Sequence, residues 1–235
     1  MADLRDAMNR LLGRTLLLVL TLGPFAFAAQ AAEDFSAAER ALFMSNQLAN
    51  IKPPARLQYR YHKSGSLEPG FDDTVTLSLQ PRADKSCCAA NAEFLTGARR
   101  INLPEVESAE GNPVLLYFLE RDIREMNRLT KGQSGYFRKR IRMAVYQGAQ
   151  MRELTLPYEG KTVAARQIMV APYLDDPLRP RFEQLATKRY VFTLSDAVPG
   201  SVYAISARVE GSDANAPVLA EEMLIEGAAP PPRYP

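Results

Sequence analysis

The sequence has little of the side-chain chemistry on which most catalytic sites depend. Its 235 residues contain one histidine, two cysteines and no tryptophan. A histidine cluster is therefore impossible, and two adjacent cysteines lack the further ligands that a zinc site needs. The patterns G-x-S-x-G and H-E-x-x-H and a glycine-rich phosphate loop are also missing. Glu221 and Glu222 are adjacent in a predicted strand, so they point to opposite faces rather than forming an acid–base pair. We expect no enzymatic activity, no cofactor and no metal.

An excess of charge of one sign is also missing. The chain has 29 basic and 27 acidic residues, a net charge of +2 at pH 7. Because phosphate binding favours a strongly basic domain, this balance argues against nucleic acid as a partner. After residue 31 no apolar run approaches the roughly 20 residues that span a bilayer.

The N-terminal residues follow the pattern of an export signal. Three arginines within residues 5–14 precede the apolar run 16–22, and Ala29-Gln30-Ala31 supplies the small-x-small cleavage pattern. We predict a signal peptide over residues 1–31, cleaved between Ala31 and Ala32. The mature chain is then expected in the periplasm, with no stable membrane span.

The two cysteines, Cys87 and Cys88, are adjacent. The simplest interpretation is a pair of small apolar residues at the start of a strand. In an oxidising compartment they are also candidates for a vicinal disulfide, for pairing with another chain, or for thiols. Redox catalysis is disfavoured because its usual spacing is C-x-x-C.

Two segments are predicted to be helical and most of the remainder to be strands. Ser36 and Glu39 have capping-box spacing, and apolar residues recur every three or four positions over 36–51. A longer amphipathic helix is predicted over 113–131, with Asn112 as N-cap, Pro113 in the first turn and Gly132 after its end. Strands are predicted by alternation or by turn signals over 57–62, 74–79, 89–95, 98–103, 137–145, 150–156, 161–170, 189–194, 202–209 and 218–225.

The segment 137–145 is predicted as a strand with one basic face. Arg138, Arg140 and Arg142 alternate with apolar residues, and three arginines on one face suit an anionic partner or a solvated surface.

This order of elements predicts a mainly β (α+β) fold. We expect one domain over residues 32–229: a curved antiparallel sheet, or half-open β-barrel, of about ten strands. The 113–131 helix would cover its concave face, with the second helix at the N-terminus. Residues 230–235, which include three prolines, are predicted to be a disordered tail.

The order helix, strands, long helix, strands behind a signal peptide resembles the LolA/LolB-like periplasmic lipoprotein carriers. The nearest local match is Lys188-Arg189-Tyr190-Val191-Phe192-Thr193-Leu194-Ser195 followed by Val198-Pro199-Gly200, which is similar to the closing strands of such domains. The resemblance implies an apolar cavity, plugged by helices, that receives acyl chains. The functional arginine of the carriers matches no single residue here, and the resemblance does not account for the adjacent cysteines.

From these patterns we predict a periplasmic carrier or sensor that binds an acyl chain, a lipid or another apolar ligand between the sheet and the 113–131 helix. Opening of that helix would expose the cavity. The candidate lining residues are Leu77, Leu79, Phe118, Leu119, Phe137, Ile141, Met143 and Phe192. The alternative is a solidly packed interaction module that docks a periplasmic or outer-membrane protein through an edge strand or the arginine face.

Overall fold

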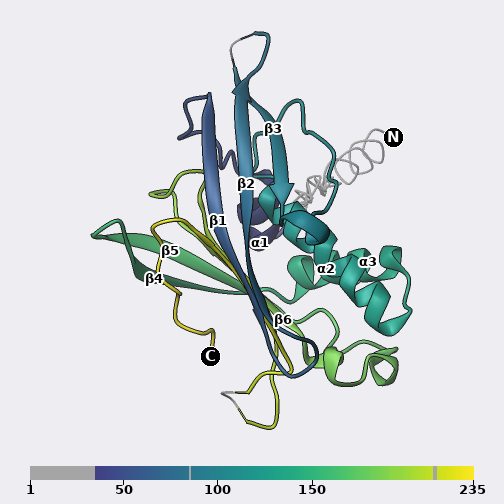
Figure 1. Cartoon of the computed structure of the whole chain (residues 1–235). Helices are drawn as coiled ribbons and strands as arrows, with labels where there is room; N and C mark the ends of the chain where they lie inside the picture. Colours follow the sequence, from purple (N-terminus) through teal and green to yellow (C-terminus); the bar gives the residue numbers. More distant parts are fainter. Residues whose placement is uncertain (1–34, 85, 214–215) are drawn as a thin grey trace, which may run out of the picture. The chain divides into compact units, whose positions relative to one another are not determined.

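The structure, a computed structural model, describes residues 35–84, 86–213 and 216–235 (Figure 1). These residues belong to one compact unit, residues 35–235. The predicted signal peptide, with its cleavage site at Ala31 and Ala32, lies outside the described residues.

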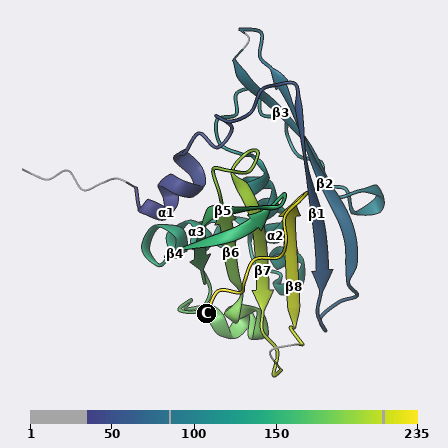
Figure 2. The ribbon, with the colours of Figure 1, turned by 90° about the vertical axis from the view of Figure 1, so that its left-hand side faces the viewer.

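The main element is one antiparallel sheet in the order β3-β2-β1-β8-β7-β6-β5-β4. Its last strand in sequence, β8, lies beside β1, so a three-stranded N-terminal meander and a five-stranded C-terminal meander share one sheet (Figure 2). The outer strands β3 and β4 do not pair with each other, so the sheet stays open. The strands are β1 (Ala55–Ser64), β2 (Phe71–Pro81), β3 (Cys87–Phe94), β4 (Gln150–Tyr158), β5 (Lys161–Val170), β6 (Arg189–Leu194), β7 (Val202–Val209) and β8 (Leu219–Ile225).

The mainly β, α+β fold is confirmed, whereas the expected ten strands are eight within the described ranges. The predicted strand 98–103 is wrong: it contains a 3-10 turn, η2 (Gly97–Arg99), and a single bridge between Ile101 and Phe94. The alternation in β1 is confirmed, since Leu57, Tyr59 and Tyr61 are buried while their neighbours along the strand are exposed.

Two long helices lie on one face of the sheet (Figure 1). α2 (Val114–Thr130) confirms the predicted 113–131 helix. Asn112 Oδ1 accepts from the backbone N–H of Val114 at 3.2 Å, so this side chain serves the helix start as expected. The helix ends one residue earlier than the glycine signal suggested, because Lys131 takes the left-handed conformation (φ 57°).

The second long helix, α3 (Ser134–Gln147), replaces the predicted strand 137–145. The buried residues Phe137, Ile141 and Val145 follow one another at intervals of four, which is the repeat of one helix face. Met143 lies off that face and is 36% exposed. Including it in the apolar set made a helical pattern look like a strand.

The predicted N-terminal helix 36–51 is shorter than expected. The capping box is confirmed: Ser36 Oγ accepts from the Glu39 backbone N–H at 3.1 Å, and Glu39 Oε2 accepts from the Ser36 N–H at 2.9 Å. The helix α1 (Ala37–Glu39) then passes into a π-helical turn, η1 (Arg40–Met44), closed by the Ser45 N–H on the Arg40 carbonyl at 2.9 Å. Two further 3-10 turns, η3 (Arg179–Arg181) and η4 (Glu183–Thr187), precede β6.

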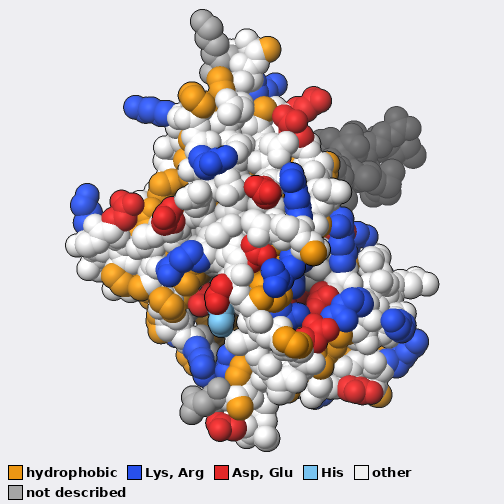
Figure 3. Space-filling model, in the orientation of Figure 1, with side chains coloured by type: hydrophobic (Ala, Val, Ile, Leu, Met, Phe, Trp, Pro, Cys, Tyr) orange, Lys and Arg blue, Asp and Glu red, His pale blue; other side chains and the backbone are white. Residues whose placement is uncertain are grey.

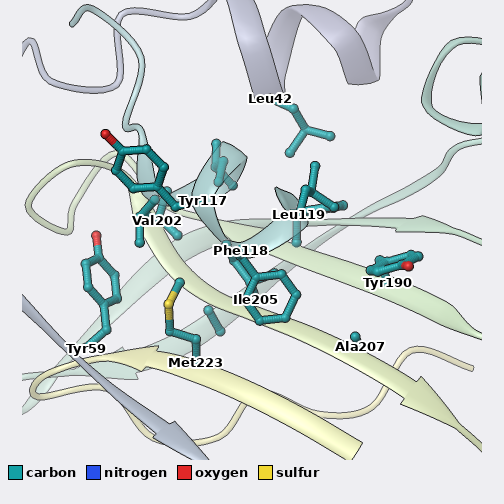
Figure 4. Packing of buried hydrophobic residues seen from close by; sticks show 14 of the residues in the cluster. Leu42, Tyr59, Tyr117, Phe118, Leu119, Tyr190, Val202, Ile205, Ala207 and Met223 are labelled. Atoms are coloured by element: carbon teal, nitrogen blue, oxygen red, sulfur yellow. The ribbon is translucent and has the colours of Figure 1, made fainter. Parts of the chain in front are cut away.

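The space between α2 and the sheet is filled by side chains. Figure 4 shows Phe118 of α2 lying over Ile205 of β7 and beside Met223 of β8. All three are at most 1% exposed. On another side of α2, Leu119 points toward Leu42 of η1 (Figure 4). The helix therefore contributes to two packing layers.

The C-terminal residues lie against the sheet. Gln167 Nε2 of β5 donates to the Pro232 carbonyl at 3.1 Å, and the Arg152 guanidinium of β4 lies 4.8 Å from the ring centre of Tyr234. The segment 230–235, predicted to be a disordered tail, therefore has specific contacts.

Candidate functional site

An apolar hollow on the described residues lies among the α1–η1 segment, α2 and α3. This apolar groove has a volume of about 710 Å³, within the roughly 300–1,000 Å³ of small-molecule sites. Its apolar walls come from Phe35, Phe43, Met44, Leu116, Leu119 and Ile123. The groove lies on the side of α2 that faces η1, not between α2 and the sheet.

Exposed apolar side chains are concentrated in this groove. Phe35, Phe43, Met44 and Leu116 are 42%, 39%, 52% and 58% exposed. They make up half of the eight large hydrophobic side chains that are exposed in the described ranges, and all four line the groove. Single exposed apolar residues are ordinary, whereas several that converge on one hollow mark a binding surface.

Hydrogen bonds and buried side chains attach the wall formed by α1 and η1 to the rest of the fold. Ser36 Oγ donates to the Val145 carbonyl of α3 at 3.2 Å. Beyond the turn, the Gln47 Oε1 accepts from the Asn112 backbone N–H at 2.8 Å, which connects the segment to the start of α2. Ala38, Ala41 and Leu42 add buried apolar contacts. Phe43 and Met44 project from the segment into the open side of the groove.

The rim of the groove carries arginines. Arg138 donates twice to the Glu120 carboxylate, at 3.0 and 2.8 Å. Arg124 lies 3.6 Å from the same carboxylate. Arg142 is exposed and has no charged partner among the residues that the structure describes. Glu39 is the second carboxylate at the groove, so three cations meet two anions there.

The predicted arginine face is wrong as a single face, because these residues are on a helix rather than a strand. Arg138 and Arg142 line the apolar groove. Arg140 instead anchors α3 to the loop after β5: its Nε lies 2.8 Å from the buried Asp176 carboxylate and donates to the Pro172 carbonyl at 3.1 Å.

The eight predicted lining residues lie in three different places. Leu119 and Ile141 line the apolar groove. Met143 lines a more polar hollow beside the start of β4. The other five are buried in the core at 1% exposure or less: Leu77, Leu79, Phe118, Phe137 and Phe192.

Buried charges fasten α2 to the sheet, which the sequence reasoning missed. Asp122 of α2 and Lys188, just before β6, form an ion pair at 0% exposure of both side chains. The Tyr190 hydroxyl of β6 donates to the other Asp122 carboxylate oxygen. Because a buried charge is costly without its partner, this contact holds α2 in place strongly.

A second group of ion pairs extends along α2 toward β1. Arg121 donates to the buried Glu221 carboxylate of β8 at 2.6 Å. Lys63 of β1, which is directly opposite Glu221 in the sheet register, donates to Glu125 at 3.0 Å and to Glu68 at 2.8 Å. Together these contacts join α2 to the middle of the sheet.

The pKa values of Glu125, Glu221 and Lys63 are shifted toward their charged forms. Burial by itself would raise the pKa of Glu125 and Glu221, but the cations around them lower both pKa values below the usual range. For Lys63, burial lowers the pKa, but hydrogen bonds to Glu68 and Glu125 raise it by more, so the net direction is upward. Glu125, Glu221 and Lys63 therefore stay ionised at neutral pH.

Cys87 and Cys88, which begin β3, are joined as a vicinal disulfide across a cis peptide. Cys88 is fully buried in the core cluster. The pair lies outside the set of residues that line the apolar groove.

In the described part of the chain, no cluster of three or more histidine, cysteine or carboxylate side chains is arranged to hold a metal. No helix over those residues has the length and apolar character to cross a membrane.

The comparisons with known proteins give a weak likeness in fold. No family model matches the sequence, and no curated protein matches it either. Among solved structures, the crystal structure of the Mycobacterium tuberculosis lipoprotein LppX is similar at 7% identity and a TM-score of 0.31. The match covers 77% of this chain and 90% of that one. It is a weak resemblance in fold and shows neither a shared family nor a shared ligand.

Proposed function

We propose that this protein is a non-enzymatic, exported carrier or sensor of the periplasm that binds an acyl chain in the apolar groove. The observation that supports the proposal is the convergence of Phe35, Phe43, Met44 and Leu116 on one hollow. A signal peptide ahead of the folded unit, as the sequence predicts, would place this groove outside the cytoplasm.

An acyl chain suits the groove because its walls are apolar and its charged groups lie at the rim. Each methylene transferred from water to such walls contributes about 0.8 kcal/mol. Binding would also cover side chains that the free protein exposes to water. The charged rim, with three arginines against two carboxylates, favours a ligand with a negative end.

The wall that moves in this proposal is the α1–η1 segment rather than α2. Opening α2 away from the sheet would separate Asp122 from Lys188 and Arg121 from Glu221. Breaking one buried pair costs about 3–5 kcal/mol when a charge is left unpaired. The α1–η1 segment holds to α3 through a hydrogen bond from Ser36 and packs on the core through Ala38, Ala41 and Leu42. Displacing it would expose these small apolar contacts but would separate neither of the two buried ion pairs.

The proposal is tested by changing two groove residues that contribute little to the core. Phe43→Ser and Leu116→Ser should each weaken binding of a fluorescent fatty acid several-fold, because each removes exposed apolar wall. Their free energies of unfolding should change by less than about 1 kcal/mol. Leu178→Ser is the matched control, since Leu178 is 36% exposed and lies outside the groove.

Mass spectrometry of the gently purified protein should also show co-purifying lipid. Equal affinity of all three variants and the parent protein would contradict binding in this groove. An absence of any fatty-acid binding would overturn the proposed function itself.

An interaction module is the second candidate, and the sheet edges bear on it. The edge of β3 carries bridges to Ile101 and Val106. Beyond its pairing with β5, β4 has a bridge from Tyr158 to Ala228 at its end, and the rest of its outer edge has no strand partner among the described residues. An open edge favours pairing with a strand of another chain. Capture of a protein that protects the β4 amides from hydrogen exchange, without lipid, would favour this candidate.

A further inference from the structure

A second hollow lies beside α2 and has the opposite chemistry. This basic cleft, of about 380 Å³, lies between α2 and the loop that follows β3. Its charged lining consists of five cations, Lys63, Arg99, Arg121, Arg124 and Arg128, and one carboxylate, Glu125. Figure 3 shows Lys and Arg side chains interleaved with Asp and Glu over the part of this face where α2 lies.

Three of the five cations are already engaged. Lys63 and Arg121 are nearly buried and bind the carboxylates behind the cleft, as described above. Arg128 pairs with Glu125 at 2.8 Å and also with Glu68. These contacts hold the inner wall of the cleft rigid and leave its outer wall to the remaining two arginines.

The remaining two, Arg99 and Arg124, have open hydrogen-bonding capacity. Arg99 lies 3.6 Å from Asp73, and Arg124 lies 3.6 Å from Glu120. Neither guanidinium makes a hydrogen bond within the described ranges. Arg99 is also held in place over the Phe71 ring, 4.4 Å from its centre. Each side chain is 51% exposed. A guanidinium with free N–H groups suits a carboxylate or phosphate, which it binds through two parallel hydrogen bonds.

The basic cleft and the apolar groove meet at Arg124. This residue lines both hollows. The segment after β3 also borders both, since Leu95, Arg99 and Ile101 line the cleft while Leu103 and Pro104 line the groove. An apolar surface therefore leads across α2 into a cationic one.

We propose that the basic cleft binds the anionic head group of the same molecule whose acyl chain occupies the apolar groove. Arg99 and Arg124 contact the head from the two sides of the cleft, and Lys63, Arg121 and Arg128, each paired with a carboxylate, form its back wall. The ligand class is a single-chain anionic amphiphile with a carboxylate or a phosphate. This inference rests on the proposed function, because it assumes that the groove holds the chain.

The test compares ligands that differ in the head group and share one chain. Calorimetric titrations use myristate, myristoyl lysophosphatidylglycerol and the uncharged monomyristoylglycerol, against the parent protein, Arg99→Gln, Arg124→Gln and the double variant. Arg100→Gln is the matched control: Arg100 is 55% exposed, neighbours Arg99 and lines neither hollow. Thermal unfolding of every variant verifies that it is folded.

We expect the parent protein to bind at least one anionic ligand about tenfold or more tightly than the neutral one at low salt. The double variant should lose that preference while keeping its affinity for monomyristoylglycerol, and Arg100→Gln should change neither. Added salt should reduce the preference, since both arginines are half exposed. If the double variant loses only the preference for myristate, the head group is a fatty-acid carboxylate. If it loses only the preference for the lysolipid, the head group is a lipid phosphate.

Two results would overturn the inference and leave the proposed function standing. One is equal affinity of the parent protein for charged and neutral ligands. The other is a double variant that keeps the full anionic preference. If none of the three ligands binds the parent protein, the proposed function fails instead.

Discussion

Replacing Lys188 with methionine should destabilise the protein more than any loss of exposed charge. Lys188 and Asp122 have no exposed surface, and the ammonium is the only cation within ion-pair distance of that carboxylate among the described residues. Lys188→Met leaves Asp122 buried with one remaining donor, the Tyr190 hydroxyl. An uncompensated charge in such a place costs about 3–5 kcal/mol. For a chain of this size that is a fall in the melting temperature of about 6–20 °C.

Urea unfolding followed by circular dichroism measures the effect, with two comparisons. The double variant Asp122→Leu/Lys188→Met should be less destabilised than Lys188→Met alone, because it removes both charges and keeps apolar volume. Arg166→Met is the exposed control: Arg166 pairs with Glu153 at 2.6 Å, their side chains are 46% and 69% exposed, and the substitution should cost at most about 1 kcal/mol. A cost for Lys188→Met no larger than that of Arg166→Met would refute the view that this pair fastens α2.

Three further predictions concern acid stability, a turn and the groove wall. Cations lower the pKa values of Glu125 and Glu221 from 4.5. The stability that these two carboxylates contribute is therefore complete above about pH 4.5 and is lost progressively as the pH falls below it. Urea midpoints that stay constant down to pH 3 would contradict this loss of stability. Gly200→Ala should lower the stability by about 1–3 kcal/mol, because φ is +71° and a Cβ would lie 2.6 Å from Cδ1 of the buried Leu57. An unchanged melting temperature would count against that strain. Ser36→Ala should cost about 1 kcal/mol of stability and increase hydrogen exchange of the α1 amides, because Ser36 caps that helix and donates to the Val145 carbonyl. Unchanged exchange would show that contacts other than those of Ser36 hold the α1–η1 wall.

The sheet was the most predictable part of the fold. Two-residue alternation located β1 and β2, and glycine or proline turns separated β4 from β5 and β6 from β7. Such alternation follows directly from one buried and one exposed face. The strand order could not be predicted, because the pairing of β1 with β8 depends on a contact between the two ends of the described chain.

The helix α3 shows why charge alternation misleads. Arg138, Arg140 and Arg142 are two residues apart, which on a strand gives one face but on a helix turns each by about 200° from the one before. Arg138 therefore reaches Glu120 of α2, whereas Arg140 reaches Asp176 in a different direction. The spacing of four between Phe137 and Ile141 was the available signal for the helix.

The apolar groove was predicted in kind but misplaced. The sequence predicts a cavity between α2 and the sheet, because the apolar stripe of α2 would face that cavity. In the structure that stripe is packed, and the open surface comes from residues such as Leu116 and Met44 that belong to no buried face. The ion pairs at Asp122 and Glu221 were also missed, because nothing local marks a charged residue as buried until its partner in a distant strand is known.

Ionic strength should act very differently on the two sets of charges around α2. Those that bind it to the sheet are shielded from water, so added salt barely weakens them, whereas Arg99 and Arg124 stand half in solvent and are readily screened. If the proposed ligand binds as inferred, a rise in salt would weaken the hold on its anionic head group and leave the attachment of α2 to the sheet intact.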